Sequence, residues 1–368
     1  MATRKRSVSS EVVLPLEEES TPPFVAPGVL GSPIALTRSV KVTCFVEPDD
    51  GRSPFKKIFE KAETSIDIFL FVLGDKKVAS YLTRAVERGV RVRALLEPCP
   101  HGNQCEEPND VALSACQRLH DAGVLLKWAN PAFSKTHAKA AVIDGRRALI
   151  TTINLDKTLG SRRDYGLITN DPSVVDDLSR VFAQDWEFDK PESGCWAAPI
   201  DRSANDTVQQ YDSGLVVSPD NARSKLLEFI RSAESSLLVH MEKIDSTDTD
   251  SEIVPAIADA AARGVHVQVL MRPPDNEEHA SNFDVAKALK ASGAKVCFQE
   301  EPQCHAKMML VDRRVAFVGS QNLTVSSLDK RREIGWITDD ERATEVLERI
   351  FHQDWAAGRG LYAHGPHA

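Results

Sequence analysis

Hydrophobic and polar positions along the chain follow two periods, one typical of strands and the other typical of helices. In the first half, short apolar runs predict strands at 66–72, 90–96, near Leu125, 136–143, 148–152 and 165–169. Segments with apolar residues at every third or fourth position predict helices from Lys76, from Asn109 and at the end of the half. This alternation of strands and helices indicates an α/β sandwich built on a mixed sheet.

The second half of the chain repeats the pattern of the first. The stretch at 85–96, Ala-Val-Glu-Arg-Gly-Val-Arg-Val-Arg-Ala-Leu-Leu, corresponds to Ala-Ala-Ala-Arg-Gly-Val-His-Val-Gln-Val-Leu-Met at 260–271. Each stretch predicts a helix that ends at a glycine, Gly89 or Gly264, and is followed directly by a strand. Gln-Asp-Trp also recurs in the closing helix of each half. We therefore predict two α-β-α sandwich repeats related by pseudo-two-fold symmetry.

The length of the chain, 368 residues, exceeds the range in which one hydrophobic core usually suffices. Hydrophobic residues make up 42% and charged residues 27%, as in an ordinary soluble globular protein, so two cores can be buried. Stretches of small and polar residues favour a leader and a linker outside the repeats. The predicted boundaries are a flexible leader at 1–40, repeat 1 at 41–195, a linker at 196–214, repeat 2 at 215–358 and a tail at 359–368.

The net charge of −9 argues against broad electrostatic adhesion to nucleic acid or to an anionic membrane. No window approaches the apolar length that a membrane-spanning helix needs. The start of the chain, Met1 to Arg6, is positively charged, but the sustained apolar segment of an export signal does not follow it. These features predict a cytoplasmic protein that is soluble or peripheral at a membrane. A signal removed before residue 1 would overturn this location.

Seven cysteines are present, and none forms a Cys-x-x-Cys pair, so reduced thiols are the expected state. The alternative is a metal site or, after export, a disulfide at Cys99, His101 and Cys105, but the paired cysteine spacing of a zinc site is missing. The acidic run that begins at Asp245 lacks the glycine of a calcium-binding loop. We therefore predict no metal and no cofactor.

One group of residue types occurs twice with the same spacing. Each copy places a lysine two residues, an aspartate seven residues and an asparagine seventeen residues after a histidine, and a further acid follows. The first copy consists of His137, Lys139, Asp144, Asn154 and Asp164. The second copy consists of His305, Lys307, Asp312, Asn322 and Glu333. One copy alone would indicate an ordinary core histidine and a solvated lysine, but the duplication favours a shared function.

The apolar run around each His-x-Lys predicts a buried strand, on which residues two positions apart point the same way. A tight turn and a second strand then bring the asparagine back toward the histidine. Imidazole, ammonium and carboxamide groups are therefore expected to converge. This grouping suits a phosphodiester, because histidine serves as a neutral nucleophile or a protonated acid near neutral pH. Lysine and asparagine stabilise the charge that grows on oxygen in the transition state.

On these residues the chain resembles the phospholipase D superfamily, whose signature is His-x-Lys-x4-Asp followed by Gly-Ser-x-Asn, twice per active site. The second copy matches fully, with Gly319, Ser320 and Asn322. The first copy carries Thr151 and Thr152 in place of the glycine and the serine. Thr152 keeps a hydroxyl, whereas Thr151 adds bulk that is expected to narrow the approach to phosphate. A decayed repeat without catalysis is the alternative.

The resemblance implies a two-step displacement without a metal, at one site formed across the two repeats. His137 is expected to bond covalently to phosphorus, and His305 to protonate the leaving alcohol and then activate water or an acceptor alcohol. The groups expected to bind phosphoryl oxygens or other parts of the substrate are Lys139, Lys307, Asn154, Asn322, Thr152 and Ser320. The acids expected to orient the imidazoles are Asp164 and Glu333, and those expected to brace the structure are Asp144 and Asp312.

Phospholipid is the predicted substrate, hydrolysed or transferred at its head group, with a membrane surface as the partner. Both copies lie in one chain without a basic bias. Trp128 and Phe133 lead into the first motif, where aromatic side chains would dip into a lipid interface; core packing of both rings is the alternative. No obligate protein partner is evident.

The main rival is a metal-independent nuclease of the same superfamily. Arg162-Arg163 and Lys330-Arg331-Arg332 precede the two acids, where they would track the phosphate backbone of a nucleic acid. A cardiolipin synthase-like transfer between phospholipids is a third option. The fourth is a phosphate-binding module that retains the pocket without turnover.

Overall fold

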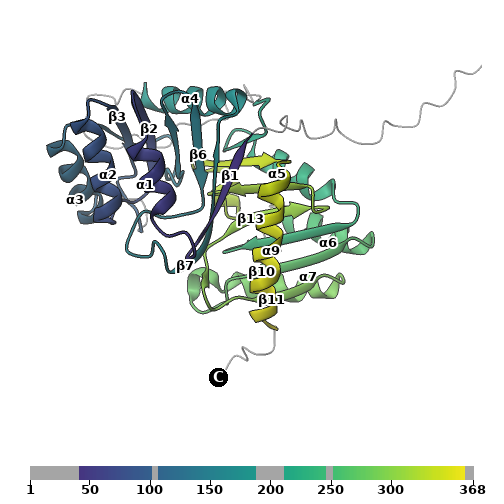
Figure 1. Cartoon of the computed structure of the whole chain (residues 1–368). Helices are drawn as coiled ribbons and strands as arrows, with labels where there is room; N and C mark the ends of the chain where they lie inside the picture. The colour runs from purple at the N-terminus through teal and green to yellow at the C-terminus, as the bar shows by residue number, and fades with distance from the viewer. Residues whose placement is uncertain (1–40, 102–106, 188–210, 246–251, 361–368) are drawn as a thin grey trace, which may run out of the picture. The chain divides into compact units, whose positions relative to one another are not determined.

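The structure is a computed structural model that describes residues 41–101, 107–187, 211–245 and 252–360 (Figure 1). The predicted leader, residues 196–210 of the predicted linker and residues 361–368 of the predicted tail lie outside these ranges. The same is true of the acidic run after Asp245 and of Cys105. The start of the predicted tail, Arg359–Gly360, forms a short strand, β16.

Repeat 1 builds one mixed sheet with helices on both faces. Its elements are β1 (Val42–Glu47), α1 (Ser53–Glu60), β2 (Ser65–Leu70), α2 (Lys76–Glu87), β3 (Arg91–Leu96), α3 (Asp110–Asp121), β4 (Leu125–Trp128), β5 (Ala140–Ile143), β6 (Arg147–Thr151), β7 (Arg162–Thr169) and α4 (Pro172–Trp186). The strand order is β1-β7-β6-β5-β2-β3-β4. The strands β2, β3 and β4 run parallel, and the other neighbours within the repeat are antiparallel.

Repeat 2 builds a second sheet with the same topology. Its elements are β8 (Leu215–Ser218), α5 (Ala222–Arg231), β9 (Ser236–Met241), α6 (Ile253–Ala262), β10 (His266–Met271), α7 (Ser281–Ala291), β11 (Lys295–Phe298), β12 (Gln303–Cys304), β13 (Lys307–Val311), β14 (Val315–Gly319), α8 (Val325–Asp329), β15 (Glu333–Thr338), α9 (Glu341–Ala357) and β16. Its order, β16-β11-β10-β9-β13-β14-β15-β8, reproduces that of repeat 1 read in reverse, with β16 added. The predicted α/β fold with two mixed sheets is confirmed.

Local sequence signals set the ends of the helices that flank the site. The carboxylate of Asp75 accepts hydrogen bonds from the N–H groups of Lys77 and Val78 at 3.0 and 2.9 Å, so α2 begins at Lys76, as predicted. Gly89 and Gly264 have φ angles of +87° and +93°. This left-handed backbone, which glycine adopts without steric cost, ends α2 and α6 and starts the following strands.

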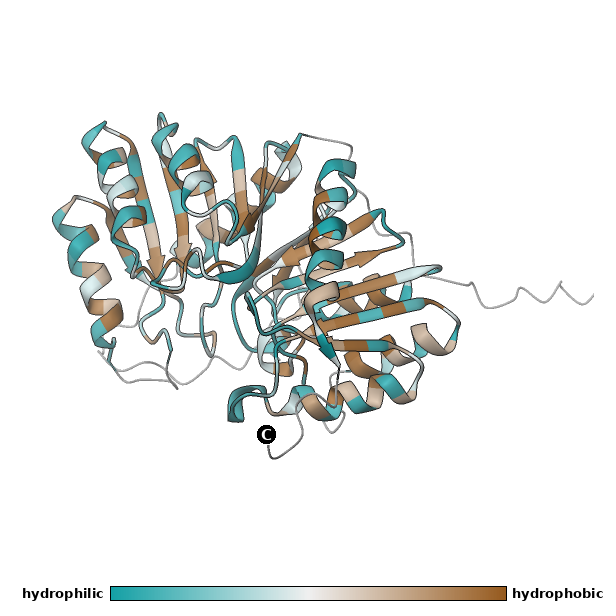
Figure 2. Cartoon of the chain, turned by 60° about the horizontal axis from the view of Figure 1, so that its bottom comes forward, coloured by the Kyte–Doolittle hydropathy of each residue, from teal (hydrophilic) through white to brown (hydrophobic). Residues whose placement is uncertain are grey.

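Three hydrophobic layers hold the sheets and helices together. One lies between the first sheet and α1, α2 and α3, and one between the second sheet and α5, α6 and α7. The third joins the opposite faces of both sheets through α4 and α9, and it contains residues of both repeats, such as Tyr165 and Trp336. Figure 2 shows the apolar strands and the helices with one polar side that this layering requires. The two repeats therefore share a core.

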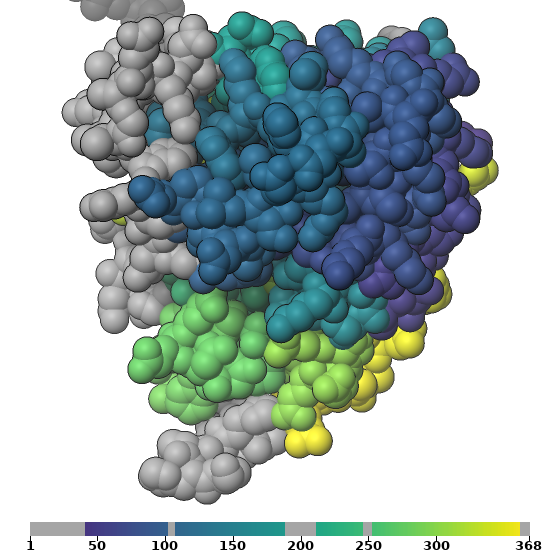
Figure 3. Space-filling view, turned by 90° about the vertical axis from the view of Figure 1, so that its left-hand side faces the viewer, coloured from purple at the N-terminus to yellow at the C-terminus, as the bar shows by residue number. Residues whose placement is uncertain are grey.

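Helices α2 and α3 form the outer surface of repeat 1 in the view of Figure 3. Among the described residues, no helix combines the length and the apolar composition needed to cross a membrane. Two elements of repeat 1, β1 and α1, precede the first strand that the apolar pattern predicted. The sequence interpretation missed β1, a strand of six residues that lies at the edge of the sheet, next to β7.

Candidate active site

The two histidines of the duplicated motif lie where the repeats meet. The N–H of His137 donates to the carbonyl oxygen of Arg332 at 2.9 Å, and the N–H of His305 donates to that of Arg163 at 3.1 Å. The predicted strand at 136–143 is wrong in its extent for this reason. The strand β5 begins only at Ala140, because the residues before it pair with repeat 2 instead of with their own sheet.

Each imidazole is paired with the acid of the other repeat. Nδ1 of His137 lies 2.9 Å from Oε2 of Glu333, and Nδ1 of His305 lies 2.7 Å from Oδ1 of Asp164. All four side chains are buried. A carboxylate at Nδ1 fixes the orientation of the ring and leaves Nε2 outside this contact.

The surroundings of His137 favour a neutral ring. The ring of Phe71 meets the imidazole edge to face, with the centroids 4.5 Å apart. Burial lowers the pKa of His137 to about 3, and the charge of Lys139 acts in the same direction, against the attraction of Glu333. A neutral imidazole has the free electron pair that a nucleophile needs.

The surroundings of His305 contain a second carboxylate, that of Glu242, which follows β9. Oε2 of Glu242 lies 2.7 Å from Nζ of Lys307 and 3.8 Å from Nε2 of His305. Although burial raises it, the charges of Lys307 and His305 hold the pKa of Glu242 well below its usual range. The side chain is therefore a carboxylate beside Nε2 of His305.

The two lysines adopt the same local geometry. Nζ of Lys139 donates to the carbonyl oxygen of His137 at 2.7 Å, and Nζ of Lys307 donates to that of His305 at 2.7 Å. Lys139 also lies over the ring of Phe71, at 4.6 Å from the centroid. Burial holds the pKa of Lys139 well below its usual range. Each lysine nitrogen is thus held beside the backbone of its histidine.

The two asparagines differ in their partners. Oδ1 of Asn154 is buried and has no hydrogen-bond partner within the described ranges. In repeat 2, Nδ2 of Asn322 donates to Glu242 at 3.3 Å, and its Oδ1 accepts from the N–H of Lys243 at 3.2 Å. Both follow the strands that return toward the histidines, as the sequence predicted, because β6 and β14 run antiparallel to β5 and β13.

The hydroxyls that follow the motifs are bonded to the protein. The hydroxyl of Thr152 donates to Asp164, the partner of His305, and accepts from the N–H of Tyr165 at 2.9 Å. The hydroxyl of Ser320 accepts from the N–H of Ile334 at 3.1 Å. The structure therefore gives both residues a supporting contact behind the site, and their contact with substrate stays a prediction.

The bulk of Thr151 is absorbed inside the sheet. Its hydroxyl donates to the carbonyl oxygen of Tyr165 at 2.8 Å, and its strand neighbour is Gly166. At the equivalent position, an added Cβ on Gly319 would lie 2.6 Å from Cα of Gly335. The first repeat thus replaces two facing glycines by one threonine and one glycine, with a hydroxyl bonded to the neighbouring strand.

The aspartates of the two motifs lie at the turns after β5 and β13, away from the imidazoles. Oδ1 of Asp144 accepts from the N–H groups of Glu63, Thr64 and Ser65 at 2.9, 2.8 and 3.2 Å. Asp312 binds the N–H groups of residues 234, 235 and 236 in the same way. Although burial acts in the opposite direction, these hydrogen bonds lower the pKa of both aspartates. This geometry is that of a structural brace.

Two of the arginines that suggested a nuclease are buried and join the repeats. Arg163 forms a bidentate pair with Asp354 of α9 at 2.6 and 3.0 Å, and Arg332 forms one with Asp185 of α4 at 2.8 and 3.0 Å. The aspartates belong to the repeated Gln-Asp-Trp motifs. The expectation that these arginines track a nucleic-acid backbone is therefore wrong, because both guanidinium groups are bound to carboxylates inside the protein.

The aromatic residues before the first motif are packed into the protein. Phe133 is buried, and the guanidinium of Arg332 lies 4.1 Å from the centre of its ring. Trp128 ends β4 and packs against the core under α2 and α3. Their predicted insertion into a lipid interface is wrong for Phe133, whose ring is covered by repeat 2.

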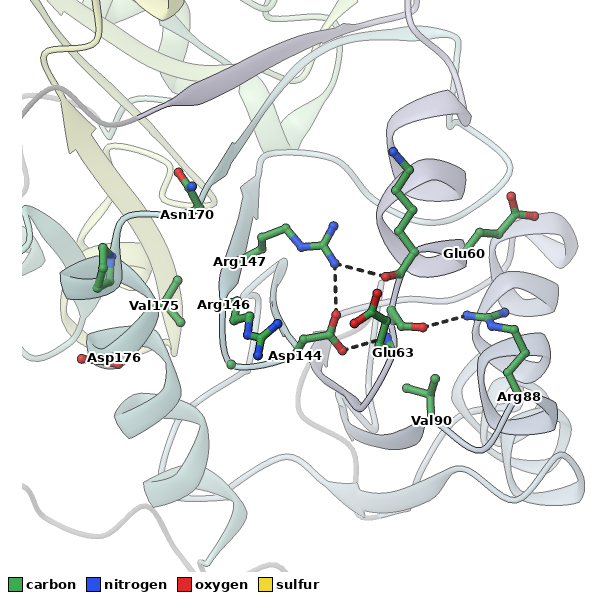
Figure 4. A pocket seen from close by; sticks show the side chains of 14 residues that line it. Glu60, Glu63, Arg88, Val90, Asp144, Arg146, Arg147, Asn170, Val175 and Asp176 are labelled. Carbon is green, nitrogen blue, oxygen red and sulfur yellow. Dashed lines mark hydrogen bonds and ion pairs between the residues drawn. The ribbon is translucent and has the colours of Figure 1, made fainter.

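A cavity of about 1010 Å³ lies at the turn around Asp144 and contains neither histidine (Figure 4). Several of its charged groups are bound by other parts of the protein. Arg147 pairs with Asp144 at 3.1 Å, and Arg88 donates to the carbonyl oxygens of Phe59 and Ala62 at 2.9 and 3.3 Å. The chemistry of the duplicated motif therefore belongs to a different part of the molecule.

No group of three or more metal-binding side chains occurs within the part of the chain that the structure describes. The thiols of Cys44, Cys116, Cys297 and Cys304 are free, whereas Cys99 is disulfide-bonded. The expectation of reduced thiols throughout is therefore wrong for Cys99. The positions of the cysteines along the sequence could not show whether the sulfur of Cys99 is free or bonded.

The sequence interpretation missed Glu242 and Phe71. The N–H groups of Asp144 and Asp312 bind the carbonyl oxygens of Ser65 and Ser236, so these serines are equivalent, and Phe71 and Glu242 each follow six residues later. An alignment of the two repeats would have revealed this replacement of an aromatic residue by an acid.

Comparison with known families identifies the domain that each repeat forms. Residues 55–186 and 226–355 each match the family model described as "Cardiolipin synthase, PLD-like domain". The chain therefore belongs to this family, within the phospholipase D superfamily.

Among curated relatives, the chain is 25% identical over 363 residues to cardiolipin synthase A of Edwardsiella ictaluri (strain 93-146), covering 90% of this chain and 71% of the relative. It is 24% identical over 351 residues to the cardiolipin synthase of Clostridium perfringens (strain 13 / Type A), covering 83% of this chain and 69% of the relative.

Two solved structures share the fold at low sequence identity. The phosphatidylserine synthase of Haemophilus influenzae Rd KW20 has a TM-score of 0.66 at 12% identity, over 87% of this chain and 86% of that chain. The polyphosphate kinase of Porphyromonas gingivalis has a TM-score of 0.61 at 16% identity, over 86% of this chain and 50% of that chain. Both likenesses concern the fold of two joined repeats.

Proposed function

We propose that this chain is a metal-independent enzyme that moves the phosphatidyl group of a phospholipid to an alcohol or to water through a covalent phosphohistidine. The observation that carries the proposal is the crossed pairing of His137 with Glu333 and of His305 with Asp164. It supplies two buried imidazoles, one from each repeat, each held at Nδ1 by a carboxylate and accompanied by a lysine and an asparagine.

In the first step, Nε2 of neutral His137 attacks phosphorus. The bond between phosphorus and the leaving oxygen breaks, and its electron pair goes to that oxygen, which takes a proton from Nε2 of His305. Lys139 and Lys307 stabilise the negative charge on the phosphoryl oxygens. The product of this step is a phosphatidyl group bound to His137, with the head-group alcohol released.

In the second step, the roles of the histidines reverse. Neutral His305 takes a proton from an alcohol or from water, and the oxygen of that molecule attacks phosphorus. The bond between phosphorus and His137 breaks and returns its electron pair to the ring. An alcohol yields a new phospholipid, and water yields phosphatidic acid.

Phospholipid and transfer are favoured by the relatives, which are named cardiolipin synthase and match most of the chain. A phospholipid substrate places the protein at a membrane surface, so we propose a peripheral association with the membrane. The nuclease is less well supported, since Arg163 and Arg332 are bound to aspartates and the net charge is −9.

The test offers phosphatidylcholine vesicles, phosphatidylglycerol vesicles and single-stranded DNA to the wild type in the presence of a chelator. The variants are His137→Ala and His305→Ala, and the control is His120→Ala, whose side chain is 76% exposed. We expect release of a head-group alcohol or formation of a new phospholipid, with at least about a thousandfold loss in both site variants and no loss in the control.

The other outcomes decide against parts of the proposal. Cleavage of DNA alone overturns the substrate class, and loss of activity in chelator overturns the metal-free mechanism. Folded protein that binds vesicles but releases no product supports the binding module instead. The ratio of phosphatidic acid to new phospholipid, measured with added glycerol, separates hydrolysis from transfer.

A further inference from the structure

At equivalent positions beside the two histidines, repeat 1 carries an aromatic side chain and repeat 2 an acidic one. After β2, Phe71 packs against the imidazole of His137 and under the ammonium of Lys139. After β9, Glu242 takes the same place beside His305 and Lys307. The pseudo-symmetric site is thus apolar on one side and anionic on the other.

The carboxylate of Glu242 is held in place by cations on both of its oxygens. Oε2 contacts Lys307, and Oε1 lies 3.7 Å from Nη1 of Arg272 and 3.6 Å from Nε2 of His279. Arg272, which follows β10, is buried, as is His279. Such an arrangement fixes a carboxylate that would otherwise be costly to bury.

The residue that follows the neighbouring strand also differs between the repeats, because its side chain carries the opposite charge. In repeat 1 the residue that follows β3 is Glu97, whose oxygens accept from the N–H groups of Thr136 and Cys99 at 2.7 and 3.0 Å. In repeat 2 the residue that follows β10 is Arg272. The acid in repeat 1 therefore supports the backbone next to His137, whereas the arginine in repeat 2 supports the carboxylate of Glu242.

We propose that Glu242 is a positioning residue that makes the two histidines unequal and assigns the acid role to His305. The proposal rests on the proposed function and deepens it. Carboxylates face both ring nitrogens of His305, Asp164 at Nδ1 and Glu242 at Nε2. His137 has a carboxylate at one nitrogen and a phenyl ring against its face.

This difference matches the needs of the first chemical step. An anion beside Nε2 of His305 attracts the N–H that must pass to the leaving oxygen. The apolar ring beside His137 offers no such attraction, so this imidazole keeps the electron pair that forms the bond to phosphorus. When that proton leaves His305, Lys307 remains as the counter-ion of Glu242, so the carboxylate is not left unpaired.

The test uses two phospholipids with identical acyl chains, one with a choline head group and one with a p-nitrophenyl head group. Choline is released only with a proton, whereas p-nitrophenolate leaves as the anion. In Glu242→Gln we expect kcat/KM to fall about thirtyfold or more for the choline ester and less than about threefold for the nitrophenyl ester. The value of kcat/KM is used because it reports only the steps up to the first irreversible release.

The matched control is Asp275→Asn. Asp275 contacts Arg272 and His279 in the same cluster, but not His305 or Lys307 within the described residues, and it is half exposed. We expect both esters to change by less than about threefold in this variant. An equal fall for both esters in Glu242→Gln would overturn the proposal, because it indicates a general structural role. Glu242→Asp, which withdraws the carboxylate but keeps its charge, is expected to lie between the wild type and Glu242→Gln, and it replaces Glu242→Gln if that variant does not fold.

A second measurement does not depend on turnover. Proton and nitrogen spectra of the histidine rings are recorded across the neutral pH range for the wild type and for Glu242→Gln. We expect the ring signals of His305 to change in the variant, because the anion beside Nε2 is gone, and those of His137 to stay unchanged. Unchanged spectra overturn the role of Glu242 even in an active enzyme. The signals of His305 can also differ between the two proteins while the wild type cleaves neither ester. That outcome overturns the proposed function but leaves the electrostatic role of Glu242 in place.

Discussion

Nδ1 of His137 lies 2.9 Å from Oε2 of Glu333, although the two residues are 196 positions apart in the chain. The same relationship joins His305 to Asp164 across 141 positions. Each repeat thus supplies an imidazole for one pair and a carboxylate for the other, so both pairs form only where the repeats meet.

Removing either carboxylate should therefore impair the histidine of the opposite repeat. In Glu333→Gln and Asp164→Asn the ring loses the group that fixes its orientation and stabilises its charge. We expect a loss of kcat of about 10²-fold to 10⁴-fold in each variant, with the fold retained. Steady-state kinetics and circular dichroism measure the two quantities. Activity within threefold of the wild type in either variant would contradict the pairing as a functional contact.

The buried neutral state of His137 makes stability depend on pH. Its pKa is about 3 in the folded protein and 6.5 for an ordinary histidine, so between these values the unfolded chain binds a proton that the folded chain does not. The contribution of this group to the free energy of unfolding is complete above pH 6.5. It falls by a few kcal/mol in total as the pH is lowered from 6.5 to about 3. Urea unfolding at about pH 7 and about pH 5 should show a smaller acid loss in His137→Gln than in the wild type. Identical losses of stability in the two proteins would disprove that His137 contributes to the pH dependence.

The bidentate pair of Arg163 and Asp354 should be a strong link between the repeats. Arg163→Met leaves the carboxylate buried without its partner, and we expect a loss of about 3–5 kcal/mol in the free energy of unfolding. The double variant Arg163→Met/Asp354→Leu should recover most of this loss, because no charge remains buried. Arg342→Ala, on the exposed side of α9, serves as the control with a change of less than about 0.5 kcal/mol. A double variant as unstable as the single one speaks against this interpretation.

Exchanging the residues at the two equivalent motif positions should have unequal effects. A Cβ on Gly319 would lie 2.4 Å from Oε1 of Gln321 and 2.6 Å from Cα of Gly335, so Gly319→Thr should cost about 3 kcal/mol or more. Thr151→Gly removes a hydroxyl with its hydrogen bonds and a buried methyl group and frees the backbone, but it creates no clash, so its cost should be about 2 kcal/mol. Thermal unfolding of the two variants measures both values, and equal costs would refute the packing argument.

The repeated architecture and the motif residues could be predicted from the sequence because they are encoded locally. The apolar runs, the helix start at Lys76 and the glycines at 89 and 264 each act within a few residues of chain. The duplicated spacing identified the histidines, lysines, asparagines and acids without reference to the fold.

What the sequence did not reveal depends on how the repeats face each other. The partners of Arg163 and Arg332 lie 191 and 147 positions away, so no local pattern separates them from solvent-exposed arginines. The same holds for the crossed acids. Glu242 could not be predicted from the duplication because it breaks the repeat: its counterpart at position 71 is a phenylalanine, and a duplicated pattern marks only what the halves have in common.

Because the two repeats lie in one polypeptide chain, mutations can change the surroundings of each histidine separately. In a symmetric dimer of identical subunits, any mutation appears on both sides at once, so the two imidazoles must keep the same neighbours. Fusion into a single polypeptide removes that constraint. Phe71 and Glu242 are unlike neighbours of this kind, which a single polypeptide permits and a symmetric dimer of identical subunits does not.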